Sequence, residues 1–126
     1  MRKSILLIDD NHLVVKSLER LLVTEGYDVI TVENGRDALD AIEKKSFDLV
    51  ISDIRMPGID GVDTICKIRE DFQRKDKKQI PEIFITGYAE GESYDKAKGL
   101  NAAGFLYKPF DKNEFLGYIA KALGDK

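Results

Sequence analysis

Five short apolar segments alternate along this chain with five amphipathic segments, and this alternation limits the possible folds more than any other feature. The apolar segments are rich in Ile, Val, Leu and Phe, and three of them are apolar on both faces. Strands are expected at Ser4–Ile8, Asp28–Val32, Phe47–Ser52, Glu82–Thr86 and Gly104–Tyr107. Strands of this kind are typical of a parallel sheet that helices cover on both sides. The sequence therefore predicts a single, doubly wound α/β fold with a five-stranded parallel sheet.

The amphipathic segments have the spacing of helices that bury one side. Apolar residues recur three and four positions apart, as one helix face requires. In the first segment this face carries Val14, Leu18, Leu21 and Leu22. Gly26 follows at the position where a helix would end. Helices are expected at Asn11–Glu25, Gly35–Lys45, Val62–Phe72, Ser93–Ala102 and Lys112–Leu123, with Asp111 as the N-cap of the last.

The composition fits one globular domain over residues 1–126. With 126 residues, 43% of them hydrophobic and 34% charged, the chain can bury one core but not two. No apolar run approaches the roughly 18 residues of a membrane span, and the N-terminus lacks the apolar stretch of a secretory signal. The single cysteine, Cys66, excludes an internal disulfide, and it is expected to be a buried, inert thiol beside the apolar stripe of the third helix. The net charge of −3, with both signs interspersed, does not favour binding to nucleic acid. The sequence therefore predicts a cytoplasmic domain without membrane or nucleic-acid partners.

Charged and hydroxyl side chains gather at the carboxyl ends of the expected strands. Asp9 and Asp10 follow the first strand, and Asp53 follows the third. Thr86 ends the fourth strand, and Lys108 follows the fifth. In a doubly wound sheet of order 2-1-3-4-5, the first and third strands are neighbours, and ligands bind beyond their carboxyl ends. The three aspartates are therefore expected to converge there.

Three converging carboxylates repel one another, and a bound Mg²⁺ would relieve that repulsion. A carboxylate can attack phosphorus and form an acyl phosphate. Lys108 and Thr86 would offer a cation and a hydroxyl donor to the phosphoryl oxygens. Each residue alone has an ordinary structural explanation, such as a turn aspartate or a surface lysine. The set favours phosphoryl transfer because every member lies at a carboxyl end of a strand.

Four motifs at these positions resemble the receiver domains of bacterial two-component response regulators. They are Leu6-Leu7-Ile8-Asp9-Asp10, Asp53-Ile54-Arg55-Met56-Pro57-Gly58-Ile59-Asp60-Gly61, Ile85-Thr86-Gly87 and Tyr107-Lys108-Pro109-Phe110. The resemblance extends over essentially the whole chain and implies the CheY-like, or flavodoxin-like, strand order 2-1-3-4-5. It also implies a phosphorylated signalling switch that catalyses only its own phosphorylation and dephosphorylation, rather than an enzyme that turns over an external substrate.

The resemblance implies a role for each matching residue. Asp53 would accept the phosphoryl group from a phosphohistidine. Asp10, Asp53 and the main-chain carbonyl of Arg55 would bind Mg²⁺ directly, whereas Asp9 would act mainly through water. Lys108 would pair with the phosphoryl group, and the Lys108-Pro109 peptide bond would be cis.

Thr86 and Tyr107 match the family's switch pair, in which the hydroxyl moves to the phosphoryl group and the aromatic ring turns inward. The surface expected to change comprises the fourth helix, the fifth strand and the fifth helix. Family members bind effectors or form homodimers through this surface, so Tyr94, Tyr107 and Phe110 are candidate contacts. The stretch Ala103–Leu106 lacks the acidic pair of winged-helix regulators, which argues against their ion-paired mode of dimerisation.

Arg55 and Tyr88 match two variable positions that, in the family, tune the lifetime of the acyl phosphate. Both side chains are large. Their size favours shielding of the acyl phosphate from water and a longer lifetime.

The partner implied by the resemblance is a sensor histidine kinase or a histidine phosphotransfer protein. Leu13 lies off the apolar face of the first helix and next to the acidic pair. With Val14 and Ser17, it either docks a histidine-bearing helix or packs at the helix rim. His12, the only histidine, has no kinase-like helix pair around it and is expected at the surface.

Three other classes of protein share part of this pattern. A phosphatase of the haloacid dehalogenase type pairs aspartates with Mg²⁺, but it needs a general acid where this chain has Arg55. A flavodoxin-like FMN carrier needs a Ser/Thr/Gly-rich loop where this chain has Asp9-Asp10-Asn11. A pseudo-receiver, which binds partners without phosphorylation, is the main alternative, although every functional position is filled. The sequence leaves open whether the domain acts alone or within a larger regulator or hybrid kinase.

Overall fold

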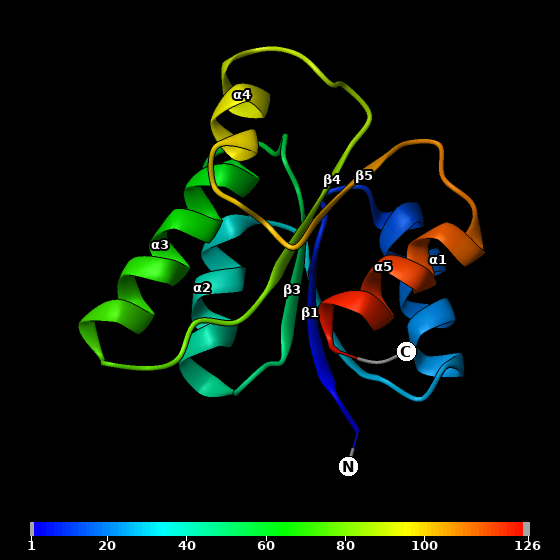
Figure 1. The fold of residues 1–126 in the computed structure, drawn as a ribbon, viewed down its shortest axis with the longest axis horizontal. Helices are drawn as coiled ribbons and strands as arrows, with labels where there is room; N and C mark the ends of the chain where they lie inside the picture. Colours follow the sequence, from blue (N-terminus) through cyan, green and yellow to red (C-terminus); the bar gives the residue numbers. More distant parts are fainter. Residues whose placement is uncertain (1, 125–126) are drawn as a thin grey trace.

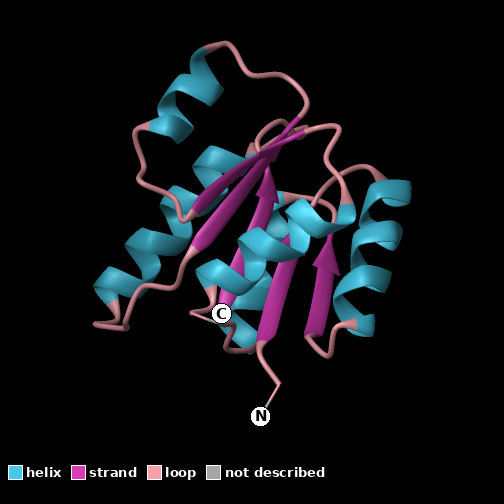
Figure 2. Ribbon diagram, turned by 45° about the vertical axis from the view of Figure 1, so that its right-hand side comes forward, coloured by secondary structure: helices cyan, strands magenta, loops and turns pink. Residues whose placement is uncertain are grey.

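The computed structural model describes residues 2–124 and contains one sheet between two layers of helices (Figure 1). The strands are β1 (Ser4–Ile8), β2 (Asp28–Val32), β3 (Leu49–Asp53), β4 (Glu82–Thr86) and β5 (Gly104–Tyr107). The helices are α1 (His12–Thr24), α2 (Gly35–Lys44), α3 (Gly61–Arg74), α4 (Glu92–Lys98) and α5 (Lys112–Ala122). All neighbouring strands are parallel, in the order β2-β1-β3-β4-β5, and Figure 2 shows their arrows pointing the same way. The predicted fold class and strand order are confirmed.

The helices form two layers that bury the two faces of the sheet. Helices α1 and α5 cover one face, and α2, α3 and α4 cover the other (Figure 1). Every residue of β3 and β4 is buried, as expected of strands that are apolar on both faces. The edge strand β2 is partly exposed. Within the described chain, none of the helices has the length and apolar content to cross a bilayer.

Most predicted elements agree with the structure to within a residue or two, and the exceptions have local causes. β3 begins at Leu49 rather than Phe47, although Phe47 is still buried in the core. The helix predicted over Ser93–Ala102 is shorter, since α4 ends at Lys98 before Gly99 and before Asn101, whose φ is +57°. A left-handed residue cannot continue a right-handed helix.

The burial of two individual side chains differs in detail from the prediction. On α1, Val15 is buried with Leu18 and Leu22, whereas the predicted face residue Val14 packs against the core but is only half-buried. The stripe that meets the sheet is therefore rotated slightly from the one predicted. Cys66 is a free, half-buried thiol at the edge of the core, not a fully buried one.

Four of the five helices begin with a side-chain N-cap, and α4 is the exception. The capping residues are Asn11, Asn34, Asp60 and Asp111, so the cap predicted at Asp111 is confirmed. Such caps satisfy backbone N–H groups that have no partner within the helix. Helix α4 begins after Gly91, whose φ is +102°, and no side chain caps it.

Candidate functional site

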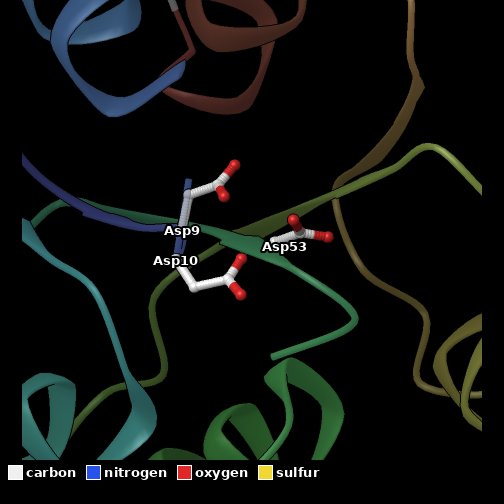
Figure 3. Close-up of side chains that lie close together, drawn as sticks. All are labelled: Asp9, Asp10 and Asp53. Carbon is white, nitrogen blue, oxygen red and sulfur yellow. The ribbon is translucent and has the colours of Figure 1, made fainter. Parts of the chain in front are cut away.

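Three aspartates converge at the carboxyl ends of the neighbouring strands β1 and β3. Strand register pairs Ile8 with Ser52, so that Asp9 and Asp10, which follow β1, face Asp53 at the end of β3. One carboxylate oxygen from each aspartate lies within 4.8 Å of the others (Figure 3). Asp9 and Asp53 are buried, whereas Asp10 is exposed. The predicted convergence is confirmed.

Lys108 supplies a cation to this acidic cluster. Its Nζ lies 3.3 Å from Asp53 Oδ2 and 3.5 Å from Asp9 Oδ2. The Lys108 N–H donates to the Thr86 carbonyl oxygen at 2.8 Å, and the Lys108-Pro109 bond is cis, as predicted. Burial lowers the pKa of Lys108, but the carboxylates of Asp53 and Asp9 more than offset this, so the pKa is raised overall. Lys108 therefore remains a cation at neutral pH.

The pKa of the Asp9 carboxyl is raised above its ordinary value, mainly because the group is buried. The nearby charge of Asp53 raises this pKa further. The backbone N–H of Asn11, 2.9 Å from Asp9 Oδ1, and the Lys108 ammonium oppose these effects only in part. The cluster contains three carboxyl groups and one ammonium group. Mg²⁺ prefers oxygen ligands and few carboxylates, so this donor set fits a divalent cation of that type.

The loop after Asp53 is closed tightly against the end of β3. The Gly61 N–H donates to the Ile54 carbonyl oxygen at 2.8 Å, and the Ser52 hydroxyl donates to the Asp53 carbonyl oxygen at 2.8 Å. A Cβ at Gly61 would overlap the Asp53 carbonyl oxygen. Only glycine therefore fits at the start of α3. Gly58, with a φ of +76°, makes the turn within the loop.

Arg55 extends from this loop over the β4–α4 loop. Its backbone N–H lies 3.4 Å from Asp53 Oδ1. Its guanidinium carbon lies 4.0 Å from the centre of the Tyr88 ring, which is a cation–π contact. The two positions predicted to tune the lifetime of the acyl phosphate thus touch each other. Sequence spacing gave no sign of this contact, because 33 positions separate the residues.

The predicted switch residues, Thr86 and Tyr107, are register partners at the ends of the neighbouring strands β4 and β5. Thr86 is buried, and its Oγ1 both donates to the Tyr88 carbonyl oxygen and accepts from the Tyr88 N–H, each at 3.0 Å. Tyr107 is 40% exposed, and its hydroxyl lies 2.9 Å from the hydroxyl of Tyr94 on α4. The Thr86 hydroxyl is therefore held by the turn after β4, and the Tyr107 ring lies at the surface.

An apolar pocket of about 340 Å³ lies beside the acidic cluster, between α1 and the loop after β5. Its lining residues are Leu13, Val14, Ser17, Leu18, Lys108, Pro109 and Phe110. Leu13, which lines this pocket, is 78% exposed. His12 is exposed as predicted, with its Nδ1 3.2 Å from Glu33 Oε2. The sequence did not indicate that Lys108, Pro109 and Phe110 form a wall facing α1, because this depends on how the loop after β5 packs.

Comparisons with known proteins point to one family. A family model for the response regulator receiver domain matches residues 5–120. The alkaline phosphatase synthesis transcriptional regulatory protein PhoP of Bacillus subtilis is 36% identical over 116 residues, which are 90% of this chain and 45% of PhoP. The probable transcriptional regulator ycf29 of Pyropia yezoensis is 35% identical over 121 residues, or 94% of this chain and 52% of ycf29. The chain thus spans about half the length of these relatives.

Solved structures agree with the sequence relatives. The chemotaxis protein CheY4 of Vibrio cholerae superposes with a TM-score of 0.86 at 29% identity, covering 98% of this chain and 100% of CheY4. The signal receiver domain of an HD domain-containing protein from Pseudomonas fluorescens has a TM-score of 0.88 at 26% identity, covering 98% of this chain and 96% of that domain. With the family match and the acidic cluster at the sheet edge, these likenesses show that the chain belongs to the receiver domains of two-component response regulators.

Proposed function

We propose that Asp53 accepts a phosphoryl group from the phosphohistidine of a sensor kinase or a histidine phosphotransfer protein. The observation that carries this proposal is the position of the Asp53 carboxylate between two other aspartates and the Lys108 ammonium. Of the two buried aspartates in this cluster, Asp53 is the more exposed, with 8% of its surface exposed against 0% for Asp9. A nucleophile must remain open to its donor in this way.

The proposed transfer is a direct displacement at phosphorus. A carboxylate oxygen of Asp53 forms a bond to phosphorus while the bond from phosphorus to the donor imidazole nitrogen breaks. The electron pair of that bond stays on the imidazole nitrogen, which takes up a proton. Lys108 neutralises part of the charge on the phosphoryl oxygens throughout. No other substrate is involved, so the reaction modifies the domain itself.

A metal ion is the expected cofactor of this step. Asp10, Asp53 and the main-chain carbonyl of Arg55 would hold Mg²⁺ directly, and Asp9 would hold it mainly through water. When bound, Mg²⁺ would neutralise negative charge that builds up on the phosphoryl group. Asp9 and Lys108 orient each other beside the acceptor oxygen, so the charge around Asp53 is arranged before the donor arrives.

Phosphorylation would then change the surface formed by α4, β5 and α5. Thr86 would exchange its two hydrogen bonds with Tyr88 for one to the phosphoryl group, and the Tyr107 ring would turn inward. A phosphoryl group adds nearly two negative charges and strong acceptors, which is enough to bias a loop between two positions. The changed surface would bind an effector or a second copy of the domain, in the cytoplasm.

The apolar pocket beside α1 would receive the phosphohistidine-bearing partner. Leu13, exposed at its mouth, offers an apolar contact close to the acidic cluster. Lys108 contributes both to the pocket and to the cluster, so a partner helix docked here would lie next to Asp53. The partner would thus dock at the same edge of the sheet at which the phosphoryl group is transferred to Asp53.

Intact mass spectrometry after incubation with acetyl phosphate tests the proposal. Wild type and Asp40→Asn, which alters an exposed aspartate of α2, should each gain one phosphoryl group when Mg²⁺ is present. Asp53→Asn should gain none. A gain that persists in Asp53→Asn would place the acceptor elsewhere. If acetyl phosphate and phosphoramidate both fail to label the folded wild type, the pseudo-receiver alternative is favoured instead.

A further inference from the structure

Helix α4 is weakly held by its own sequence. It has only seven residues, Glu92–Lys98, and it is the helix that no side chain caps. Ala97 is its one buried residue. Short helices are marginal without tertiary contacts. The position of α4 therefore depends on the contacts that its side chains make with other elements.

Ser93, in the first turn of α4, is tied to the loop that follows Asp53. Its Oγ donates to Asp60 Oδ2 at 2.9 Å. The other oxygen of this carboxylate, Oδ1, accepts from the Asp63 N–H at 2.9 Å and caps α3. Asp60 ends the loop that Gly61 closes against the end of β3. A shift of that loop is therefore transmitted to α4 through Ser93.

The next residue, Tyr94, is tied to β5. Its hydroxyl lies 2.9 Å from the hydroxyl of Tyr107, and its ring packs edge-on against Phe105 with centroids 6.1 Å apart. The hydrogen bond with Tyr107 is also the main cause of a raised pKa for Tyr94. Tyr107 directly precedes Lys108, whose ammonium pairs with Asp53. A shift of β5 is therefore transmitted to α4 through Tyr94.

Two adjacent residues of one helix thus connect to Asp53 by two routes. One route runs through the loop to Asp60, and the other runs through Tyr107 to Lys108. We propose that Ser93 and Tyr94 form a double latch that holds α4 in the unphosphorylated position and sets how readily the domain switches. This inference rests on the proposed phosphorylation of Asp53. The inference goes further by naming two residues that oppose the switch. When the Tyr107 ring turns inward, its hydroxyl moves away from that of Tyr94, so the contact between them is lost.

Thermodynamic linkage gives the latch a measurable effect. A contact made only in the resting state lowers the apparent affinity for any ligand that selects the switched state. Removal of the contact must therefore tighten binding of such a ligand. For one partly exposed hydrogen bond the expected change is about two- to tenfold in affinity.

Beryllofluoride with Mg²⁺, a mimic of the phosphoryl group, is the probe. Its affinity is measured by NMR titration for wild type, Ser93→Ala, Tyr94→Phe and the double variant. Tyr118→Phe, which removes the hydroxyl of an exposed tyrosine on α5, is the matched control. Each single latch variant should bind about two- to tenfold more tightly than wild type, and the control should match wild type.

Hydrogen exchange of the α4 amides in the free protein supplies a readout that needs no ligand. Both latch variants should exchange faster than wild type within residues 92–98, while exchange in α5 stays unchanged. Unchanged or weakened beryllofluoride affinity in both single variants would overturn the latch, even where wild type binds and Asp53→Asn does not. Failure of wild type itself to bind beryllofluoride would overturn the proposed function and the latch together.

Discussion

The guanidinium carbon of Arg55 lies over the ring of Tyr88, 4.0 Å from its centre, next to Asp53. The two residues belong to different loops, one after β3 and one after β4. Their contact therefore bridges the loop after β3 and the loop after β4, next to the acceptor carboxylate. We expect this bridge to shield an acyl phosphate on Asp53 from attacking water.

Removal of the bridge is expected to shorten the lifetime of the phosphorylated state. Arg55→Ala and Tyr88→Ala should each raise the rate of dephosphorylation by about two- to fivefold, in line with an exposed cation–π contact. Loss of phosphoryl mass with time, after removal of acetyl phosphate, measures this rate. Arg36→Ala, at an exposed arginine of α2, is the control and should decay like wild type. Equal decay rates in wild type and in the double variant would show that the bridge does not shield Asp53.

Mg²⁺ should stabilise the folded domain, because it relieves the repulsion among the three aspartates. A ligand that binds only the folded state adds about 1.4 kcal/mol at ten times its dissociation constant. Thermal unfolding of wild type and of Asp40→Asn should therefore shift upward with added Mg²⁺. Asp10→Asn should lose most of this shift, since it removes one oxygen donor without altering the buried core. An equal shift in Asp10→Asn would place the ion elsewhere.

The arrangement of the acidic cluster could be predicted from the sequence because it follows from topology. Parallel strands place their carboxyl ends at one edge, and the order 2-1-3-4-5 makes β1 and β3 neighbours. Asp9, Asp10 and Asp53 each follow directly from a strand end, so no long-range packing detail was needed. The same logic placed Thr86 and Lys108.

Contacts between loops and helices could not be predicted in this way. The bonds from Ser93 to Asp60 and from Tyr94 to Tyr107 depend on the angle at which α4 packs, which no periodicity encodes. The end of α4 was also overestimated, because the helical pattern continues past the residues that break it. The sequence shows a tyrosine at position 94, but it does not show which side chain that tyrosine meets.

Among the glycines near the carboxyl ends of the strands, Gly61 is expected to be the one that tolerates substitution by alanine least. Its Cβ would overlap the Asp53 carbonyl oxygen, so Gly61→Ala should destabilise the domain by about 2–4 kcal/mol. The displaced loop should also slow phosphorylation of Asp53.

Gly117→Ala is the contrasting variant, because a Cβ added at Gly117 on α5 would have no atom within 4 Å. Gly117→Ala should raise the free energy of unfolding by about 0.5–1 kcal/mol, because alanine has a higher helix propensity than glycine. Denaturant unfolding of both variants measures these changes, and a neutral Gly61→Ala would contradict the tight closure of the loop.

Asp71 on α3 should make a contribution to stability that disappears in acid. Its carboxylate lies 3.1 Å from Lys75 Nζ and 2.6 Å from an Arg74 nitrogen, and the hydrogen bond from Lys75 is the main reason that the Asp71 pKa is lowered. A lowered pKa favours the folded state above the ordinary aspartate pKa of 3.8, and this gain is lost as the pH falls below that value. Wild type should therefore unfold at higher denaturant than Asp71→Asn at pH 7, and the gap should be smaller at pH 3. Glu70→Gln, at the exposed neighbouring acid, should show a smaller gap at pH 7. A gap for Asp71→Asn that is the same at both pH values would mean that the ion pair is not its cause.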